Sequence, residues 1–247
     1  TISAVHSKKT TILLTITGTA TIDTDYSTAF SSKGISTVAG GNGEGLDNNQ
    51  LNITYGPDEI HLDSSGNIYV LDWNNHRVMK WPPDASVGTV VAGGNGYGEA
   101  NNQLRWPNQF HVDSSGNIYI LDQNYHRVMK WAPGDVTGTV VAGGNGFGSA
   151  NNQLDTPISM HVDSSGNIYV SSAMNYRVMK WAPGDVTGTL VAGGNGSGSA
   201  TNQLQYPSDI YVDSNGDIYI VDSFNHRVMK WAPDATEGTV VAGGNGS

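Results

Sequence analysis

Three histidines recur at intervals of fifty residues, and imidazole is a side chain that binds metal ions. They are His61, His111 and His161, and Tyr211 stands at the fourth such position. If the repeated segments converge on one axis, three imidazoles could supply the nitrogen ligands of a zinc ion and leave one position open. The competing interpretation is that duplication copied a histidine that packs against its neighbours. We favour this second interpretation and predict no metal and no cofactor.

The histidines lie within a longer repeated unit. The stretch DSSGNIYVLDWNNHRVMKW begins at Asp63, and nearly the same sequence returns from Asp113, Asp163 and Asp213. An active site needs its residues only once, so fourfold repetition indicates architecture first. Aspartates such as Asp72 are repeated with the unit, so their presence gives no sign of acid–base catalysis. We therefore predict that the chain is not an enzyme.

Each unit is predicted to contain four short β-strands. In the second copy they cover residues 109–113, 117–122, 127–131 and 138–144, and segments with Gly, Pro and Ser separate them. Both faces of the second strand are apolar, as expected for a strand between neighbouring sheets. A period of about fifty residues with four strands per unit predicts an all-β fold, a β-propeller of four-stranded antiparallel blades. Repeated tryptophans are expected to pack between blades; they are Trp81, Trp131, Trp181 and Trp231.

The sequence DSSGN predicts a tight turn between the first two strands of each blade. In the second copy, Asp113 can accept hydrogen bonds from the backbone that follows it, and Gly116 can adopt a positive φ. The alternative is a calcium-binding loop, which needs oxygen ligands at several alternating positions. Two serines separate Asp113 from Asn117, so we favour the turn.

The stretches GNIYVLDWNNHRVMKW, GNIYILDQNYHRVMKW and GDIYIVDSFNHRVMKW resemble NHL repeats. The resemblance runs from about Ser36 to residue 247, and it implies an NHL-repeat β-propeller. Four blades are evident, and five or six would result if the N-terminal arm, a missing segment or a partner chain completed the ring. The third copy has Ser172 and Tyr176 where the others have Asp and His, so a weaker polar network is expected there.

The resemblance leaves the activity open, because NHL propellers include RNA-binding modules, lyases and interaction scaffolds. Its lyase members place a metal near the propeller axis with histidine ligands, which implies the alternative of a metal-dependent lyase or hydrolase at the channel. Its RNA-binding members use basic surfaces, whereas this chain has a formal net charge of −10. The basic residues outside the repeated RVMK sequence are Lys8, Lys9, Lys33 and Arg105. We therefore expect no nucleic-acid partner.

Two regions are predicted from the extent of the repeat. Residues 1–35 form an N-terminal strand-bearing arm, in which TTILLTITGTATI alternates like a pair of strands, and residues 36–247 form the propeller. The sequence STVAGGNG, from Ser36, is predicted to be an outer strand without the three strands that should precede it. The arm could close its own ring, or it could add a strand to the open blade edge of another copy and build fibres.

One face of the propeller varies between copies. Strands alternate in direction, so the connections after the second and fourth strands of each blade emerge on the same face. These connections carry large apolar side chains, whereas those of the other face are nearly identical between copies. Aromatic groups gathered on a rigid scaffold are typical of a binding surface. The candidate partner-binding residues are Trp73, Trp106, Tyr125, Met174, Tyr206 and Phe224.

We predict a non-enzymatic extracellular interaction or structural module that binds a protein partner or itself. A carbohydrate-binding module is the third alternative, with glycans as the partner. Asn52 and Asn195 begin Asn-X-Ser/Thr sequons, so they are candidate glycosylation sites and favour an extracellular location. No stretch of about 18 apolar residues is present, so membrane insertion is not expected.

Overall fold

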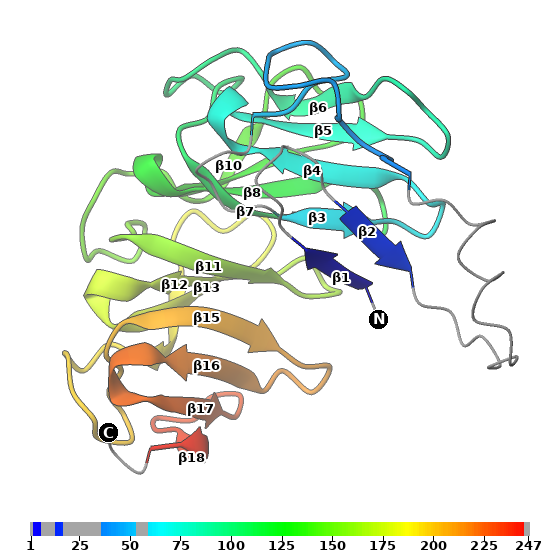
Figure 1. Ribbon diagram of the computed structural model, residues 1–247. Coiled ribbons are helices and arrows are strands. Elements are labelled where there is room, and N and C mark those ends of the chain that lie inside the picture. The colour runs from blue at the N-terminus through cyan, green and yellow to red at the C-terminus, as the bar shows by residue number, and fades with distance from the viewer. Residues whose placement is uncertain (1, 6–12, 17–35, 53–58, 245–247) are drawn as a thin grey trace, which may run out of the picture.

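The computed structural model describes residues 2–5, 13–16, 36–52 and 59–244 of the 247-residue chain. Four four-stranded antiparallel sheets follow one another along a curved row, and we call them blades 1 to 4 (Figure 1). Each blade uses its strands in chain order, as the repeat predicts. The chain is therefore an all-β β-propeller with four blades among the described residues.

The strand bounds repeat closely from blade to blade. Blade 1 contains β3 (Ile60–Leu62), β4 (Ile68–Asp72), β5 (Arg77–Trp81) and β6 (Thr89–Gly93). Blade 2 contains β7 (Pro107–Val112), β8 (Ile118–Asp122), β9 (Arg127–Trp131) and β10 (Thr139–Gly143). Blade 3 contains β11 (Pro157–Val162), β12 (Ile168–Ser172), β13 (Arg177–Trp181) and β14 (Thr189–Gly193). Blade 4 contains β15 (Pro207–Val212), β16 (Ile218–Asp222), β17 (Arg227–Trp231) and β18 (Thr239–Gly243).

The second strand of blade 2 is apolar on both faces because it packs between two neighbouring blades. In β8, Ile118 and Ile120 join a buried cluster with Leu71 of blade 1, whereas Tyr119 and Leu121 join the cluster shared with blade 3. The first strands β7, β11 and β15 also contact one another in sequence along the row. The prediction that both faces of this strand are apolar and buried is therefore confirmed.

The repeated tryptophan ends the third strand and is a packing residue, as predicted. In blade 2, Trp131 is 1% exposed and lies in the cluster between blades 1 and 2. The loop that follows passes directly over its ring, since a Cβ added to Gly138 would lie 2.7 Å from the ring atoms. Glycine is required at this position because any larger residue would displace the loop or the indole.

The DSSGN sequence forms the predicted turn. The Oδ1 atom of Asp113 accepts from the backbone N–H groups of Ser115 and Asn117, both at 2.9 Å. Gly116 has a φ of 80°, in the left-handed region that favours glycine. The aspartate thus serves the turn itself, and the turn needs no calcium ion to explain its sequence.

A buried ion pair fixes the loop that enters each blade. In blade 2, Arg127 Nε donates to Asp122 Oδ2 at 2.7 Å, and Asp122 Oδ1 accepts from the backbone N–H of Arg105 at 2.7 Å. Arg127 Nη1 also donates to the carbonyl oxygen of Glu99 at 2.9 Å. Both side chains are buried, so one pair holds the strand ends and the incoming loop together. The equivalent pairs are Asp72–Arg77 and Asp222–Arg227.

Blade 3 has the weaker network that its sequence predicts. Ser172 replaces the aspartate, and its hydroxyl accepts from the backbone N–H of Asp155 at 2.8 Å. Arg177 still donates to three loop carbonyl groups, but its Nε is buried and has no hydrogen-bond partner among the described residues. Burial lowers the pKa of Arg177. The ion pair is therefore absent from this blade.

The N-terminal arm is described only in part. Strand β1 (Ile2–Val5) pairs antiparallel with β2 (Leu13–Ile16), whereas the second half of the predicted strand pair lies outside the described residues. Residues 36–43, which were predicted to be an outer strand, are not a strand, because none of the described strands pairs with them. Ala39 is nevertheless buried in a cluster with Leu51 on the free side of blade 1. None of the described helices is long and apolar enough to cross a membrane.

Candidate functional site

Two kinds of loop form one face of the row, which we call the loop face. Corner loops join the second and third strands of a blade, and each contains a 3₁₀ turn; the four turns are Trp73–Asn75, Gln123–Tyr125, Ala173–Asn175 and Ser223–Asn225. Linking loops join the fourth strand of one blade to the first strand of the next. In blade 4 the backbone N–H of Phe224 donates to the carbonyl oxygen of Gln205 at 3.2 Å. The two kinds of loop therefore lie side by side.

The predicted partner-binding residues lie on the loop face, and four of them form stacked pairs. The Trp73 and Trp106 rings are 6.3 Å apart at an interplanar angle of 14°, and the Tyr206 and Phe224 rings are 5.0 Å apart at 12°. Trp106, Met174 and Phe224 are exposed, whereas the others are half-buried. Parallel stacking fixes the ring planes, so these side chains present ordered apolar surface.

The linking loops hold their aromatic residues in an unusual backbone conformation. Trp106 has a φ of 53°, Thr156 of 48° and Tyr206 of 63°, and each directly precedes a proline. A left-handed conformation is costly for residues other than glycine, by about 1–3 kcal/mol. Because Thr156 shares this conformation, it is a structural feature of the repeat and not of aromatic residues. The presence of Trp and Tyr at two of the three positions is instead a property of the loop face.

Sequence reasoning missed three residues of the loop face. Tyr97 and Phe147 follow the repeated GGNG sequence, and their rings pack edge-on against His76 and His126 at 5.5 and 5.8 Å. Tyr97 is 49% exposed and Phe147 is 67% exposed. Arg105 lies over the Tyr97 ring at 4.6 Å. The signal was present in the sequence, because these positions vary between copies: Tyr97 and Phe147 stand between constant glycines, and Arg105 follows a constant leucine.

The inner histidines pack against tyrosines. The rings of His61 and Tyr69 are 5.9 Å apart, those of His111 and Tyr119 are 6.3 Å apart, and the His161 ring lies edge-on to Tyr211. Burial lowers the pKa of all three histidines, and for His111 the charges of the other two lower it further. In the described part of the chain, no three His, Cys, Asp or Glu side chains form an arrangement that could hold a metal ion.

Polar side chains of the first strands connect neighbouring blades. Glu59 Oε2 accepts from the backbone N–H of Phe110 at 2.5 Å, and Gln109 Oε1 accepts from that of Met160 at 2.6 Å. Burial raises the pKa of Glu59 to about 7, against the hydrogen bond from Phe110, and the charge of Asp209 raises it further. These contacts satisfy strand N–H groups, so we assign them to the architecture.

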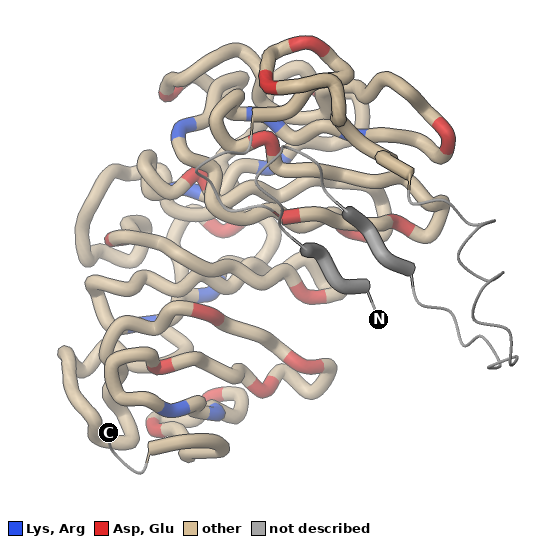
Figure 2. The backbone as a smooth tube through the Cα atoms, in the orientation of Figure 1, with Lys and Arg blue, Asp and Glu red and all other residues tan. Residues whose placement is uncertain are grey.

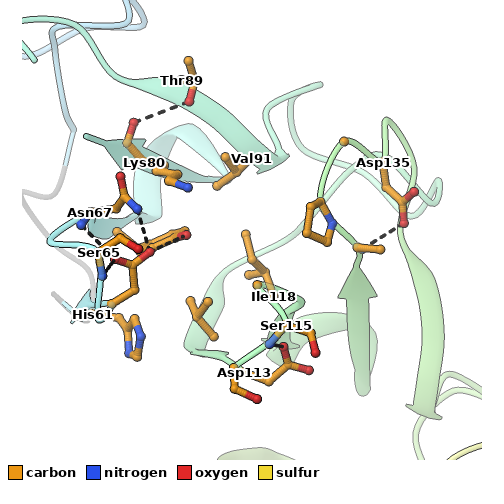
Figure 3. Close-up of a pocket in the computed structure, with 18 of the residues that line it drawn as sticks. His61, Ser65, Asn67, Lys80, Thr89, Val91, Asp113, Ser115, Ile118 and Asp135 are labelled. Atoms are coloured by element: carbon orange, nitrogen blue, oxygen red, sulfur yellow. Dashed lines mark hydrogen bonds between the residues drawn. The ribbon is translucent and has the colours of Figure 1, made fainter. Parts of the chain in front are cut away.

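The pockets between blades also repeat. A pocket of about 990 Å³ lies between blades 1 and 2, and Figure 3 shows Lys80 and Asn67 on one side and Ile118 and Asp135 on the other. A pocket of about 870 Å³ at the same place between blades 2 and 3 is lined by equivalent residues. Because these pockets repeat from blade to blade, we assign them to the architecture, as we do the turns and the tryptophans. The loop face is the region where the copies differ.

Comparisons with known proteins agree with this architecture. Residues 204–231 match the model of the NHL repeat, and a search of curated proteins found no significant match. A chain of the nidogen/laminin complex is similar with a TM-score of 0.54 and 19% identity, over 74% of this chain and 62% of that one. Streptogramin B lyase is similar with a TM-score of 0.53 and 14% identity, over 79% of this chain and 54% of the lyase chain. Virginiamycin B lyase from Staphylococcus aureus is similar with a TM-score of 0.54 and 12% identity, over 75% of this chain and 55% of the lyase chain. This chain thus spans less than two thirds of each of these solved chains, and the likeness shows the fold alone.

Proposed function

Since this chain is an NHL-repeat β-propeller, we propose that it is a non-enzymatic binding module whose loop face docks a protein partner. The observation that carries the proposal is the stacking of Trp73 on Trp106 and of Tyr206 on Phe224 on that face. Tyrosine and tryptophan contribute large contact areas at low entropic cost, and they dominate the energetics of many interfaces. A chain of the nidogen/laminin complex has a similar fold, which is compatible with this role without showing it.

The experiment is a selection of short peptides from a random phage-displayed library with the whole chain as bait. Selected peptides should bind the W73A/W106A double variant at least about tenfold more weakly, because the loss of two aromatic contacts exceeds 1.4 kcal/mol. The control is V136A/V186A, which removes two valines that are more than 80% exposed on the opposite face. Equal binding by both double variants would remove the loop face from consideration.

The proposed setting is extracellular, and the sequons at Asn52 and Asn195 are its support. Asn195 is exposed, and its amide nitrogen donates to the carbonyl oxygen of Asn202 at 3.0 Å. Asn95 and Asn145 make the equivalent contact without standing in a sequon, so the repeat explains this asparagine without glycosylation. Mass spectrometry of the protein secreted from a eukaryotic host tests both sequons. Unmodified Asn52 and Asn195 would leave the location without support.

Self-association is a second candidate. The exposed outer face of blade 4 favours it, as does the part of the blade 1 face that Ala39 and Leu51 leave exposed. Val221 of blade 4 is 37% exposed, whereas its equivalents Leu71 and Leu121 are fully buried by the next blade. On blade 1, Leu62 is 41% exposed, whereas Val112 is 5% exposed. These are the two sides of the interface that joins blades within the chain, so copies could pair head to tail. Sedimentation velocity should show concentration-dependent assembly that Val221→Glu abolishes; a monomer at all concentrations would end this candidate.

The competing proposal of a metal-dependent lyase rests on the fold likeness to two lyases. A shared fold carries no activity by itself, and the inner histidines pack against tyrosines. Metal analysis of the purified protein decides the matter cheaply. Stoichiometric zinc that is lost in His111→Ala would favour the enzyme over the binding module. Binding to a glycan array would instead favour the carbohydrate-binding alternative.

A further inference from the structure

The corner loop of blade 2 departs from a construction that the other three blades share. In those blades an asparagine amide donates both to a carbonyl oxygen of the linking loop, at 2.8–2.9 Å, and to the side chain that ends the second strand. The asparagines are Asn75, Asn175 and Asn225, and their second acceptors are Asp72, Ser172 and Asp222. Blade 2 has Tyr125 at this position. Its corner therefore lacks both hydrogen bonds.

The presence of Tyr125 in place of asparagine also affects the buried Asp122–Arg127 ion pair beneath the corner loop. Asp122 is fully buried, and burial raises its pKa to about 6, against the lowering by the Arg105 N–H and by Arg127. An asparagine at position 125 would give this carboxylate a further donor, as it does in blades 1 and 4. Blade 2 thus departs from a stabilising local rule, and such departures are expected at functional sites.

The tyrosine instead takes part in a cluster of aromatic residues around one cation. The Arg105 guanidinium lies 4.6 Å from the Tyr97 ring centre and 5.7 Å from those of Trp106 and Tyr125. With the Asn124 amide oriented so that its oxygen faces the guanidinium, that oxygen lies within hydrogen-bond distance of all three nitrogens, at 2.9 Å from Nη1, 3.3 Å from Nη2 and 2.5 Å from Nε. We call these five residues the Arg105 cluster. Its members come from one linking loop and one corner loop, and Trp106 is held in the left-handed conformation described above.

The guanidinium in this cluster has three aromatic neighbours and one oxygen acceptor, the Asn124 amide, among the described residues. Aromatic faces attract the cation, and they limit the side-chain freedom that binding would otherwise have to remove. None of the ion pairs between described residues includes Arg105. One amide oxygen cannot satisfy five N–H donors. The arrangement suits a planar acceptor that arrives from outside and accepts two parallel hydrogen bonds.

The charge of the surroundings also distinguishes Arg105. The chain carries 22 acidic and 12 basic residues, and acidic residues occur along the whole described trace in Figure 2. Among the residues that the structure describes, Arg105 is the one basic residue outside the RVMK sequences. The lysines of the RVMK sequences stand near the far ends of their strands, so on the loop face Arg105 is the cation that attracts an acidic partner. The charge of Arg105 would therefore determine how such a partner is oriented on the loop face.

We propose that the Arg105 cluster binds an aspartate or glutamate side chain of the protein partner. The guanidinium donates hydrogen bonds from its edge to the carboxylate, while the exposed parts of the Tyr97 and Trp106 rings contact the apolar atoms beside it. This inference rests on the proposed role of the loop face in protein binding, and it specifies one contact within that role. Arg105 acts as the specificity-determining residue of the site.

The test uses the peptides selected on the whole chain. Each peptide is synthesised with its selected sequence and again with Asp and Glu replaced by Asn and Gln. The wild-type chain should bind the acidic form at least about tenfold more tightly, because a bidentate ion pair is stronger than a neutral hydrogen bond. Arg105→Gln should reduce this ratio to about one. Arg105→Lys, which keeps the charge without the planar fork, should retain only part of it.

Lys180→Gln is the matched control, because it removes the same charge from the end of β13 remote from the corner loops. Thermal unfolding of each variant shows that the fold is retained. The proposal is overturned if the wild type does not prefer acidic peptides, if Arg105→Gln keeps the preference, or if Lys180→Gln loses it equally. Weaker binding by W73A/W106A without any acid preference would leave the loop face in place and remove this inference alone.

Discussion

The corner loops of blades 2 and 4 have the same backbone but use it differently. Both follow a linking loop that places an aromatic residue, Trp106 or Tyr206, in the left-handed region before a proline. In blade 4, Asn225 links the corner to the linking loop and to Asp222. In blade 2, Tyr125 makes neither hydrogen bond and lies beside Arg105. The comparison indicates that blade 4 keeps the stabilising construction, whereas blade 2 replaces it with a charged aromatic surface.

The largest effect is expected when the buried ion pair of blade 2 is broken. Arg127→Ala leaves Asp122 buried without its main partner, and such losses cost about 3–5 kcal/mol. Arg177→Ala in blade 3 should cost less stability, because Ser172 is uncharged and the loss of Arg177 would leave no buried charge unpaired. Urea unfolding of the two variants checks the difference. Equal losses would mean that the ion pair contributes nothing beyond the loop hydrogen bonds.

The pH dependence of stability should reveal Asp122. Its pKa of about 6 in the folded protein lies above the ordinary 3.8, so the folded state binds the proton more tightly. This contribution is fully present below about pH 4 and is lost as the pH rises through about 6, for a total of about 3 kcal/mol. Relative to Asp122→Asn, the wild type should therefore lose stability over this range. A difference that stays constant with pH would contradict the assignment.

Transfer of the blade 2 residue to blade 4 should have a moderate effect. Asn225→Tyr removes two hydrogen bonds from the corner and should destabilise the protein by about 1–3 kcal/mol. It should not create a binding site, because Gln205 stands where blade 2 has Arg105. Chemical denaturation and the peptide assay measure the two effects. Unchanged stability would show that these amide contacts have no net value.

The smallest effect is expected at the inner strands, away from both corners. Glu59→Gln should stabilise the protein by about 1 kcal/mol at pH 8, because a neutral amide replaces a carboxylate whose burial is unfavourable. Gln109 already makes the equivalent contact with Met160 in blade 2. The gain should vanish below pH 5, where Glu59 is protonated. A loss of stability at both pH values would show that the charge is needed.

Much of the fold could be predicted because the repeat gives each residue three equivalents for comparison. The buried tryptophans, the Asp113 turn and the weak network around Ser172 all follow from residue type and position within one blade. The outer strand at 36–43 was predicted wrongly, because a strand requires a pairing partner and none is described there. Local sequence does not reveal the absence of that partner.

The candidate site was less predictable because it joins loops that are separated along the chain. The variation of Trp106 and Tyr125 is visible when the copies are aligned. The contact of Tyr97 with Arg105 depends on a linking loop that folds back on itself, and the contact with Tyr125 depends on how that loop meets a corner loop. The aromatic positions could thus be predicted, whereas the cation among them required the structure.

Tyr125→Asn tests most directly whether blade 2 gives up stability for binding. The variant restores the residue found in the other three blades, and both its unfolding free energy and its affinity for the selected peptides would be measured. We predict a gain of about 1–2 kcal/mol in stability from two restored hydrogen bonds, together with weaker peptide binding. A variant that is no more stable, or one that binds the peptides as tightly as the wild type, would contradict the account.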